Sequence, residues 1–523
     1  MANPKLKATF SDISNWKWFV LLAILLRGPL WLYFGHLVNV HLPADQKVYS
    51  NFIRDDYMYF FDPVDNFFSN GTFSYYAHAP YTGRMPGYSA VYFLFRLLFS
   101  KQIAAYCVVG MQFLLSSISV YVLALTSYKI FESKKAFYIT YGLYVLAVFP
   151  GFFDFIIVAE SFSVSALIFT LYYLVKYIKE GNSTRDLVLA GVFLAWTVFL
   201  REYTGFLIAG FPTALVAYHF LSRKDGFIRS VTAGILFCVP FIIADTAWTI
   251  RNYNATGKFI PIASADVDTY GKLYSSSWNA IDELICDWGE NGAPFDANGM
   301  AFYYRTPSNK ISYKFPERIF KGVSTYNVDS LVHLRELYGR YYYTKDTSIE
   351  RISSNRIIEL CTIYRDDYIK HNQFAYRVIK PLKDIKYLMF FSGTGYLPMP
   401  SFSGCNLLEK GIKLVFTVLY FFILIGGILG MLLYVIRKKF KGFMPWLMIL
   451  SCLMIMGILI MVSILQEPRY SVHIFMILVL FTSYLISELL KGNFKTGGKL
   501  KGLPAFAFVP IFVACLLNFI NTY

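Results

Sequence analysis

The chain is poor in charged residues and in cysteine for its length. Only 16% of its 523 residues are Asp, Glu, Lys or Arg, whereas 56% are hydrophobic, and the mean hydropathy is positive. Because soluble domains carry about 25% charged residues, this composition excludes an ordinary soluble protein. The seven cysteines are an odd number, and four of them lie in apolar stretches, which excludes a disulfide framework. The sequence therefore predicts an integral membrane protein.

Apolar windows long enough to cross a membrane recur along the whole chain. A spanning helix needs about 20 predominantly apolar residues. The windows fall near residues 17–36, 102–127, 136–150, 157–177, 187–200, 204–221, 230–250, 411–434, 443–465, 470–490 and 503–520. The sequence thus predicts an all-α polytopic protein with eleven transmembrane helices.

Basic residues mark one side of these predicted helices. The formal net charge is +16, and Lys and Arg gather at the amino terminus and in every second connection, as in RKKFK at residues 437–441. Cytoplasmic loops carry most cations in membrane proteins, so this alternation explains the charge without a nucleic-acid partner. We therefore expect a multi-pass protein of a bacterial inner membrane, with a cytoplasmic amino terminus and with residues 37–101 and 251–410 outside.

Three parts follow from this topology. Residues 1–250 hold seven helices and the first external loop (37–101), residues 251–410 form an external cap, and residues 411–523 hold the last four helices. The cap is too polar to span, but DSLVHLRELYGRYY and SSNRIIELCTIYRDDYIKHNQFAYRVI within it are predicted to be helical. The cysteines of the cap allow at most one disulfide: Cys286, Cys361 and Cys405.

The first external loop contains the acidic and aromatic stretch RDDYMYFFDPVDNFFSNG at residues 54–71. An amphipathic helix is predicted here by apolar residues at helical spacing, although Pro63 weakens the pattern: Tyr57, Phe60, Phe61, Val64 and Phe68. PGYSAVYFLFRLLF at residues 86–99 predicts a second amphipathic helix. Asp55 and Asp56 lie toward the polar face, where they are either solvated carboxylates at a helix start or functional acids.

Ionisable residues mark the predicted external ends of several distant helices. They are Glu160 in VAESFS, Arg201 in FLREYTG, Arg251 in AWTIRNY and Arg469 in QEPRY. Charged side chains at one membrane depth are costly unless they face one another or a watery cavity. A shared polar cleft on the external side explains them together. The alternative for each arginine is a side chain that only extends toward the lipid headgroups.

In this order the motifs resemble the polytopic GT-C glycosyltransferases. The acidic pair before Tyr57, then NGTFS and GRMPGYSAVYFLFRLLF, look like the start of that family's sequence. AESFSVSALIF, FLREYTGF, AWTIRNYNATGKFIPI and EPRYSVHIFMILVL resemble its later landmarks. The chain is most similar to the bacterial relatives of protein O-mannosyltransferases and lipid A aminoarabinose transferases. The resemblance covers nearly the whole chain, and its strength lies in the order of motifs that are individually weak.

The resemblance implies that a sugar is transferred, with inversion, from a polyprenyl-phosphate carrier to a hydroxyl acceptor on the external face. An acidic residue of the first loop would be the base, here Asp56 or Asp55, with Asp56 favoured. The departing lipid phosphate gains negative charge, which guanidinium groups at headgroup depth would stabilise. The donor phosphate is expected to bind Arg201, Arg251 and Arg469, with Arg84 and Lys258 behind them. The cavity is expected to be lined by Glu160, Tyr57, Tyr59, Arg27 and Asp245.

Arg27 differs from the other arginines because it lies in the middle of the first predicted span, beside Gly28 and Pro29. At that depth a side chain does not easily reach the headgroups. We therefore expect Arg27 either to pair with a carboxylate or to line the cavity.

No zinc site is expected, because the histidines lack metal-ligand spacing. Asp55, Asp56 and Glu160 could hold Mg or Mn, but the abundance of arginine favours a site without a metal or other cofactor. Two other function classes stay open: a transporter or flippase of lipid-linked sugars, and a polymerase or ligase of such sugars. A transporter is expected to contain internal repeats, which the sequence does not show. A polymerase or ligase would not need the early acidic pair.

Overall fold

The computed structural model of the chain describes residues 13–41, 57–75, 80–181, 183–222, 226–262, 275–292, 299–308, 312–400, 402–438, 442–461 and 467–491. Within these ranges the regular elements are helices, and the only extended pairing is an isolated antiparallel bridge between Ser74 and Pro80. Asp55, Asp56 and the predicted span at 503–520 lie outside the described residues. The all-α fold class is confirmed.

Within the described ranges, eight helical stretches are long and apolar enough to cross a membrane: Trp16–Leu37, Lys101–Phe131, Glu160–Lys179, Glu202–Leu221, Phe227–Thr256, Leu407–Arg437, Phe443–Ile460 and Pro468–Leu490. They correspond to α2 (Trp16–His41), α5 (Lys101–Phe131), α8 (Glu160–Lys179), α10 (Leu207–Ala217) with its flanking turns, α11 (Phe227–Thr256), α18 (Leu407–Lys438), α19 (Phe443–Met461) and α20 (Val472–Leu490) with the preceding turn. The chain is therefore a multi-pass membrane protein.

The predicted count of eleven spans is not confirmed. Helix α6 (Lys134–Leu146) and the stretch Phe149–Phe155, which overlaps α7 (Val148–Phe152), make a ninth span if the pair is counted as one helix bent by 43°. Helix α9 (Thr184–Leu200) has 17 residues, at the lower limit of the roughly 17–25 that a span requires. It packs along α8 and α11 as a spanning helix would.

Helix α20 (Val472–Leu490) lies at the centre of the membrane part and packs against α18, α6, α5 and α8. Of its most apolar window, 89% is buried, whereas only 22% of the α11 window is, so α11 lies at the rim. Glycines let α18 approach α20 closely. A Cβ on Gly430 would lie only 2.1 Å from the carbonyl oxygen of Phe481. Small residues at helix contacts are how membrane helices gain packing area without a hydrophobic driving force.

Both helices predicted in the first external loop are present, as α3 (Tyr57–Asn70) and α4 (Gly87–Arg96). Helix α3 continues through Pro63 and buries Phe61, whose ring stacks on Tyr92 of α4 with centroids 3.6 Å apart. Asp65 is buried as well and pairs with Arg96 at 2.9 Å. Phe68, expected on the apolar face, stacks on Phe93 of α4 at 5.4 Å between centroids but stays 41% exposed, because it lies in the last turn of α3.

The cap contains α13 (Ser276–Asp287), α14 (Met300–Arg305), α15 (Val328–Tyr343) and α16 (Thr347–His371), followed by a π-turn (η7, Ala375–Ile379) and α17 (Lys380–Met389). The two helices predicted from its sequence are confirmed as α15 and α16. The cap has a hydrophobic core of its own, with Trp278, Leu334 and Ile357 among its buried members. Cys286 and Cys361 are buried there as free thiols, so they form no bridge.

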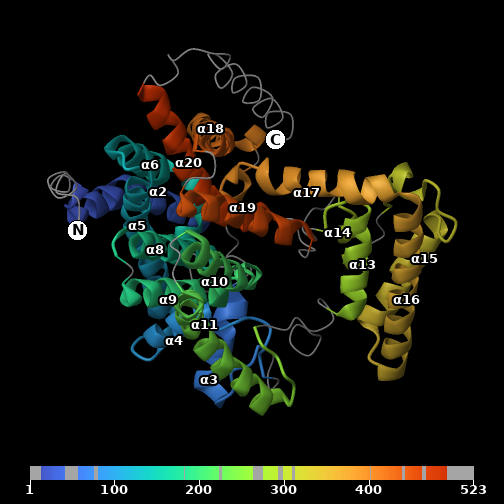
Figure 1. Ribbon diagram of the computed structural model, residues 1–523. Coiled ribbons are helices and arrows are strands. Elements are labelled where there is room, and N and C mark those ends of the chain that lie inside the picture. Colours follow the sequence, from blue (N-terminus) through green and yellow to red (C-terminus); the bar gives the residue numbers. More distant parts are fainter. Residues whose placement is uncertain are drawn as a thin grey trace.

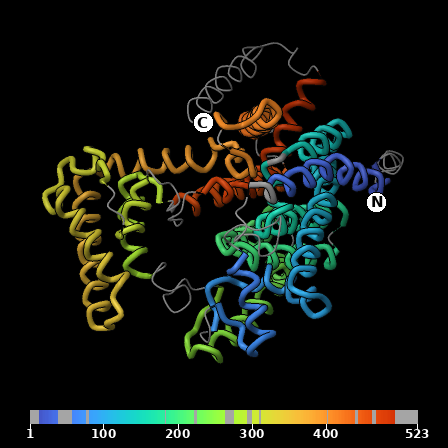
Figure 2. Tube along the Cα trace, turned by 180° about the vertical axis from the view of Figure 1, so that it is seen from behind, coloured from blue at the N-terminus to red at the C-terminus, as the bar shows by residue number. Residues whose placement is uncertain are grey.

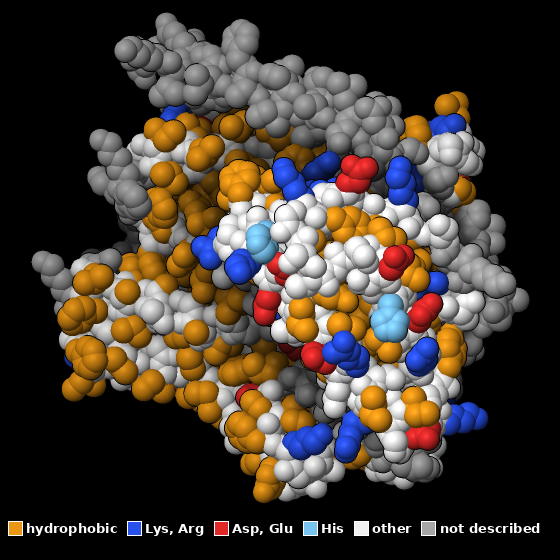
Figure 3. Space-filling model, turned by 90° about the vertical axis from the view of Figure 1, so that its right-hand side faces the viewer, with side chains coloured by type: hydrophobic (Ala, Val, Ile, Leu, Met, Phe, Trp, Pro, Cys, Tyr) orange, Lys and Arg blue, Asp and Glu red, His pale blue; other side chains and the backbone are white. Residues whose placement is uncertain are grey.

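Helix α17 joins the cap to the membrane helices. In Figure 1 the cap stands to the right of the membrane helices, and α17 runs between them; the view from behind in Figure 2 shows the same connection. Figure 3 faces the cap side, where charged side chains of both signs are scattered over the centre and the left of the view is largely hydrophobic.

Candidate functional site

Glu160 and Arg201 form a buried ion pair. Glu160 is the first residue of α8 and Arg201 directly follows α9, and their exposed fractions are 0% and 1%. Because α8 and α9 pack along their length, the start of one meets the end of the other. The Arg201 Nη2 atom contacts Glu160 Oε1. Two residues of the predicted polar cleft are thus brought together.

Arg469 joins this pair from a third place in the sequence. It lies in the 3₁₀ turn η10 (Pro468–Ser471) that leads into α20, and its Nε atom is 3.6 Å from Glu160 Oε1. Arg469 also pairs with Glu467. One carboxylate oxygen of Glu160 therefore faces two guanidinium groups, and the two arginines and two glutamates sum to a formal charge of zero.

A buried histidine supports the same cluster. His473 is fully buried, and its Nε2 lies 2.7 Å from the Ser163 hydroxyl while its Nδ1 lies 2.8 Å from the Tyr203 hydroxyl. Tyr203 also donates to the Tyr470 carbonyl at 3.3 Å. Since Tyr203 follows Arg201 and Tyr470 follows Arg469, these bonds tie the two arginine-bearing turns together.

Tyr396 ties the end of the cap to the Arg469 turn. Its hydroxyl accepts from the Arg469 backbone N–H at 3.3 Å, and burial raises the pKa of Tyr396. The sequence prediction missed Tyr396, Tyr203, Glu467 and the role of His473. Proximity in sequence to Arg201 and Arg469 could have suggested Tyr203 and Glu467, but no local pattern marks Tyr396.

The segment with α3 and α4, predicted to be the first external loop, packs against the start of α8. The Arg84 guanidinium lies 5.6 Å from the ring centroids of both Tyr59 and Phe60. Phe60 in turn packs on Tyr88, at 4.7 Å between centroids. Tyr88 also packs on Phe162 of α8, two residues after Glu160, at 5.6 Å between centroids, and burial together with the Glu160 carboxylate raises the pKa of Tyr88. Arg84 and Tyr59 are therefore linked to the Glu160 cluster through two aromatic rings.

Arg251 holds the loop that follows α3. Its Nη1 donates to the Tyr81 carbonyl at 2.7 Å and its Nη2 to the Phe73 carbonyl at 3.2 Å, next to the Ser74–Pro80 bridge. Through these hydrogen bonds the Arg251 guanidinium holds the backbone of the loop in place. Its predicted role toward a donor phosphate stays a prediction.

Three other predicted residues lie around this loop or beyond it. Tyr57 begins α3 and is half-buried, and burial together with Asp62 raises its pKa. Asp245 accepts from the Ile262 backbone N–H at 3.0 Å, which closes the turn after α11. Lys258 is exposed on that turn. Their roles in the cavity also stay predictions.

Arg27 pairs with Asp154 at 2.5 Å and donates to Ser116 at 2.9 Å, so its expected pairing with a carboxylate is confirmed. Asp154 lies in the turn that leads into α8 and also accepts from Ser161 at 2.7 Å. The fully buried Gln112 of α5 donates to three carbonyls of the same turn, at 2.9–3.3 Å. These buried polar groups hold the turn from which Glu160 emerges.

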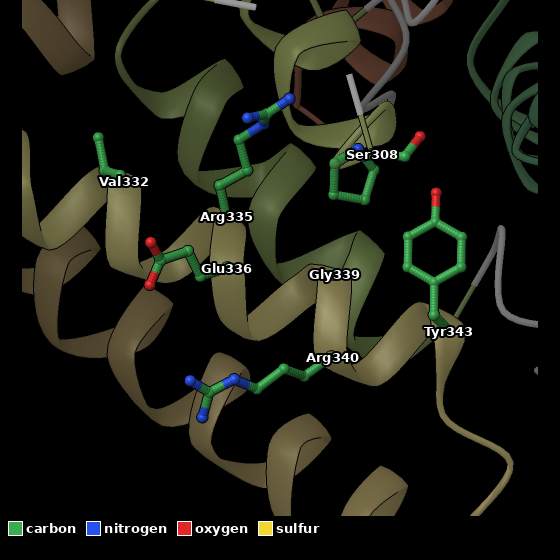
Figure 4. Close-up of a pocket in the computed structure, with 8 residues that line it drawn as sticks. Ser308, Val332, Arg335, Glu336, Gly339, Arg340 and Tyr343 are labelled. Carbon is green, nitrogen blue, oxygen red and sulfur yellow. The ribbon is translucent and has the colours of Figure 1, made fainter. Parts of the chain in front are cut away.

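Among the described residues, no group of three or more His, Cys, Asp or Glu side chains could hold a metal ion. Asp55 and Asp56 lie outside those residues, so the expectation of a metal-independent site is untested. A separate groove of about 760 Å³ lies in the cap and shares no residue with the Glu160 cluster (Figure 4). It runs along α15 beside Ser308; the Tyr343 side chain points toward Ser308, and Arg340 extends away from both.

No protein-family model matches the chain, and no curated protein does. Among solved structures, the chain is similar to the Archaeoglobus fulgidus oligosaccharyltransferase tethered to an acceptor peptide with an NVT sequon, at 12% identity and a TM-score of 0.47. That match covers 97% of this chain but only 54% of the archaeal protein, so the chain spans about half its length. A second similar structure is apo ArnT from Cupriavidus metallidurans, at 12% identity and a TM-score of 0.33, with 90% of this chain and 77% of ArnT covered.

Both solved structures are GT-C glycosyltransferases, the class that the sequence motifs resemble. With TM-scores below 0.5, these likenesses establish neither a reaction nor any residue role for this chain.

Proposed function

We propose that the protein is an inverting glycosyltransferase that moves a sugar from a polyprenyl-phosphate carrier to a hydroxyl acceptor on the external side of the membrane. One observation carries the proposal. Arg201 and Arg469, from turns more than two hundred residues apart, converge on Glu160 in a buried cluster beside the first external loop. Buried ionisable residues in membrane proteins pair with one another and mark sites for charged ligands, which supports this cluster as the place of a charged ligand or transition state.

In the proposed reaction, the acceptor hydroxyl oxygen attacks the anomeric carbon and passes its proton to an Asp carboxylate. The bond between the anomeric carbon and the phosphate oxygen breaks, and its electron pair stays on the phosphate. The base is Asp56 or Asp55, which directly precede Tyr57, the first residue of α3. General-base help of this kind contributes about 10²–10⁴-fold in rate.

The departing phosphate gains negative charge, and the arginines are proposed to stabilise that charge. The described cluster is formally neutral, so Glu160 and Glu467 hold the guanidinium groups in place but also cancel their charge. A phosphate must therefore take over hydrogen-bond donors from a carboxylate or gain a further cation. Arg84, linked to the cluster through Phe60 and Tyr88, is the cation we assign to this step.

The test uses the full-length protein in lipid nanodiscs with a panel of polyprenyl-phosphate sugars and measures release of polyprenyl phosphate. We expect release with at least one donor, a loss of about 10²-fold or more in Asp56→Asn or Asp55→Asn, and a similar loss in Arg201→Gln. Arg229→Gln, an exposed cation at the start of α11, is the matched control and should keep full activity. Activity with nucleotide sugars alone, or full activity in the Asp55→Asn/Asp56→Asn double variant, would overturn the proposal.

A transporter of lipid-linked sugars is the competing class. Transport of a fluorescent polyprenyl-phosphate sugar across proteoliposomes, undiminished by the aspartate substitutions, would favour that class instead.

A further inference from the structure

The segment Phe374–Phe390, hereafter the arm, comprises the π-turn η7 and α17 with one flanking residue at each end. One of its faces is apolar although it is exposed. Phe374 is 69% exposed, Val378 39% and Leu382 61%. Residues spaced by four lie on the same face of an α-helix, and a π-turn, with its i→i+5 bonds, brings them closer to one line. The π-turn between Phe374 and Leu382 thus keeps the three side chains on one face.

The same segment is basic. It contains four Lys or Arg residues and one acid, Asp384. Asp384 is buried and pairs with Lys380 at 3.0 Å, and Lys383 donates to the Gly289 carbonyl at 3.1 Å. Arg377 and Lys386 are exposed beside the apolar face. The arm therefore presents cations and large apolar groups together, the combination that binds a phospholipid interface.

The position of the arm brings it to that interface. Leu388 and Met389 are buried in the core of the membrane helices, and the Tyr420 hydroxyl of α18 donates to the Met389 carbonyl at 2.9 Å. Tyr420 lies about 20 Å along α18 from Leu407, at 1.5 Å per residue. The other end of the arm joins α16 in the cap (Figure 1). A segment that starts among spanning helices and ends in a polar cap has to cross the headgroup layer.

We propose that the exposed face of the arm, formed by Phe374, Arg377, Val378, Leu382 and Lys386, binds phospholipids of the leaflet on the cap's side. The two cations bind headgroup phosphates, and the three apolar side chains insert between the upper parts of the acyl chains. The bilayer thereby holds the arm, and through it the cap, at a set height above the Arg469 turn that Tyr396 contacts. This inference does not depend on the proposed reaction.

The test places a nitroxide spin label on Leu382→Cys in the full-length protein in nanodiscs. The matched control is Ile352→Cys on α16, because Ile352 is 68% exposed in the cap but lies outside the arm. Labelled wild-type protein gives the background from native cysteines. We expect the ratio of collisions with oxygen, which partitions into lipid, to collisions with a water-soluble nickel chelate to be about fivefold higher at position 382 than at 352. Equal ratios would overturn the proposal.

A second measurement tests the cations and the competing partners. When phosphatidylglycerol replaces phosphatidylcholine, the label at position 382 should become less mobile, and R377Q/K386Q should abolish this response. An unchanged response in that variant would refute phosphate binding by Arg377 and Lys386. Dipolar coupling between labels at position 382 would show that a second copy of the chain covers the face, and that result would also overturn the proposal.

Discussion

Neutralising Glu160 should destabilise the protein strongly, because it leaves two buried guanidinium groups with less compensation. At the 3.6 Å that separates Arg469 Nε from Glu160 Oε1, the gross attraction is about 5 kcal/mol for an effective dielectric constant of about 20. Arg201 is closer still and almost completely buried. Removal of one partner of a buried pair costs about 3–5 kcal/mol, and we expect Glu160→Gln to lose that much free energy of unfolding.

The pairing itself is measured by a double-mutant cycle with Arg201→Gln. The two single variants should together lose more free energy of unfolding than the double variant E160Q/R201Q, by at least about 2 kcal/mol. In the double variant Arg469 still has Glu467 as its partner. Unfolding in mixed micelles of rising dodecyl sulfate content, followed by tryptophan fluorescence, gives the four free energies.

A matched control is the pair of Arg437 and Glu488 at 2.7 Å, whose side chains are 26% and 11% exposed. Glu488→Gln should cost only about 1 kcal/mol or less, as partly solvated pairs do. If the Glu160 and Arg201 effects instead add to within about 0.5 kcal/mol, the two residues do not act as a pair and the site reasoning fails.

Three further outcomes follow from the structure. Gly430→Val should prevent α18 from packing on α20, because even a Cβ would lie 2.1 Å from the Phe481 carbonyl oxygen. The thermal unfolding midpoint should fall in this variant and should not fall in the control Gly411→Val, which lies at an open position. Hydrogen bonds, the largest effect coming from the Ser324 backbone N–H, lower the pKa of Asp367 to about 2. The stabilisation by this carboxylate is therefore complete above the unfolded-state pKa of about 4 and is lost as the pH falls toward 2. Asp367→Asn should remove this pH dependence from hydrogen exchange in the cap. Arg251→Gln should speed proteolysis of the first external loop about tenfold, since a loss of roughly 1–2 kcal/mol in hydrogen bonds raises the open population by that factor, and unchanged cleavage would contradict the clamp.

Local patterns in the sequence predicted much of the fold. The apolar windows, the two helices of the first external loop and the helices α15 and α16 of the cap depend on residues within a few turns of one another, and period and length are visible in that range. Phe61 and Val64 of α3, for example, are buried as their spacing predicted. The exposure of Phe68 shows the limit, because a side chain in the last turn of α3 that packs on Phe93 of α4 still leaves much of its surface open.

The candidate site divides in the same way. The residue types at the predicted helix ends marked Glu160, Arg201 and Arg469 as one cleft, since charge near a membrane is costly enough to indicate function by itself. Which group each one contacts could not be predicted. Arg251 binds backbone carbonyls, Arg27 finds Asp154 and His473 joins two turns, and each contact depends on helix packing that brings together residues far apart in the sequence.

Composition and spacing alone thus predicted a helical membrane protein and the kinds of side chain at its polar end, because hydrophobic length and the cost of buried charge act on each segment separately. Only the tertiary structure decided that Glu160 lies between Arg201 and Arg469 and that Tyr396 of the cap reaches the same turn. Those contacts depend on helix crossing and register, and each is a property of several segments together.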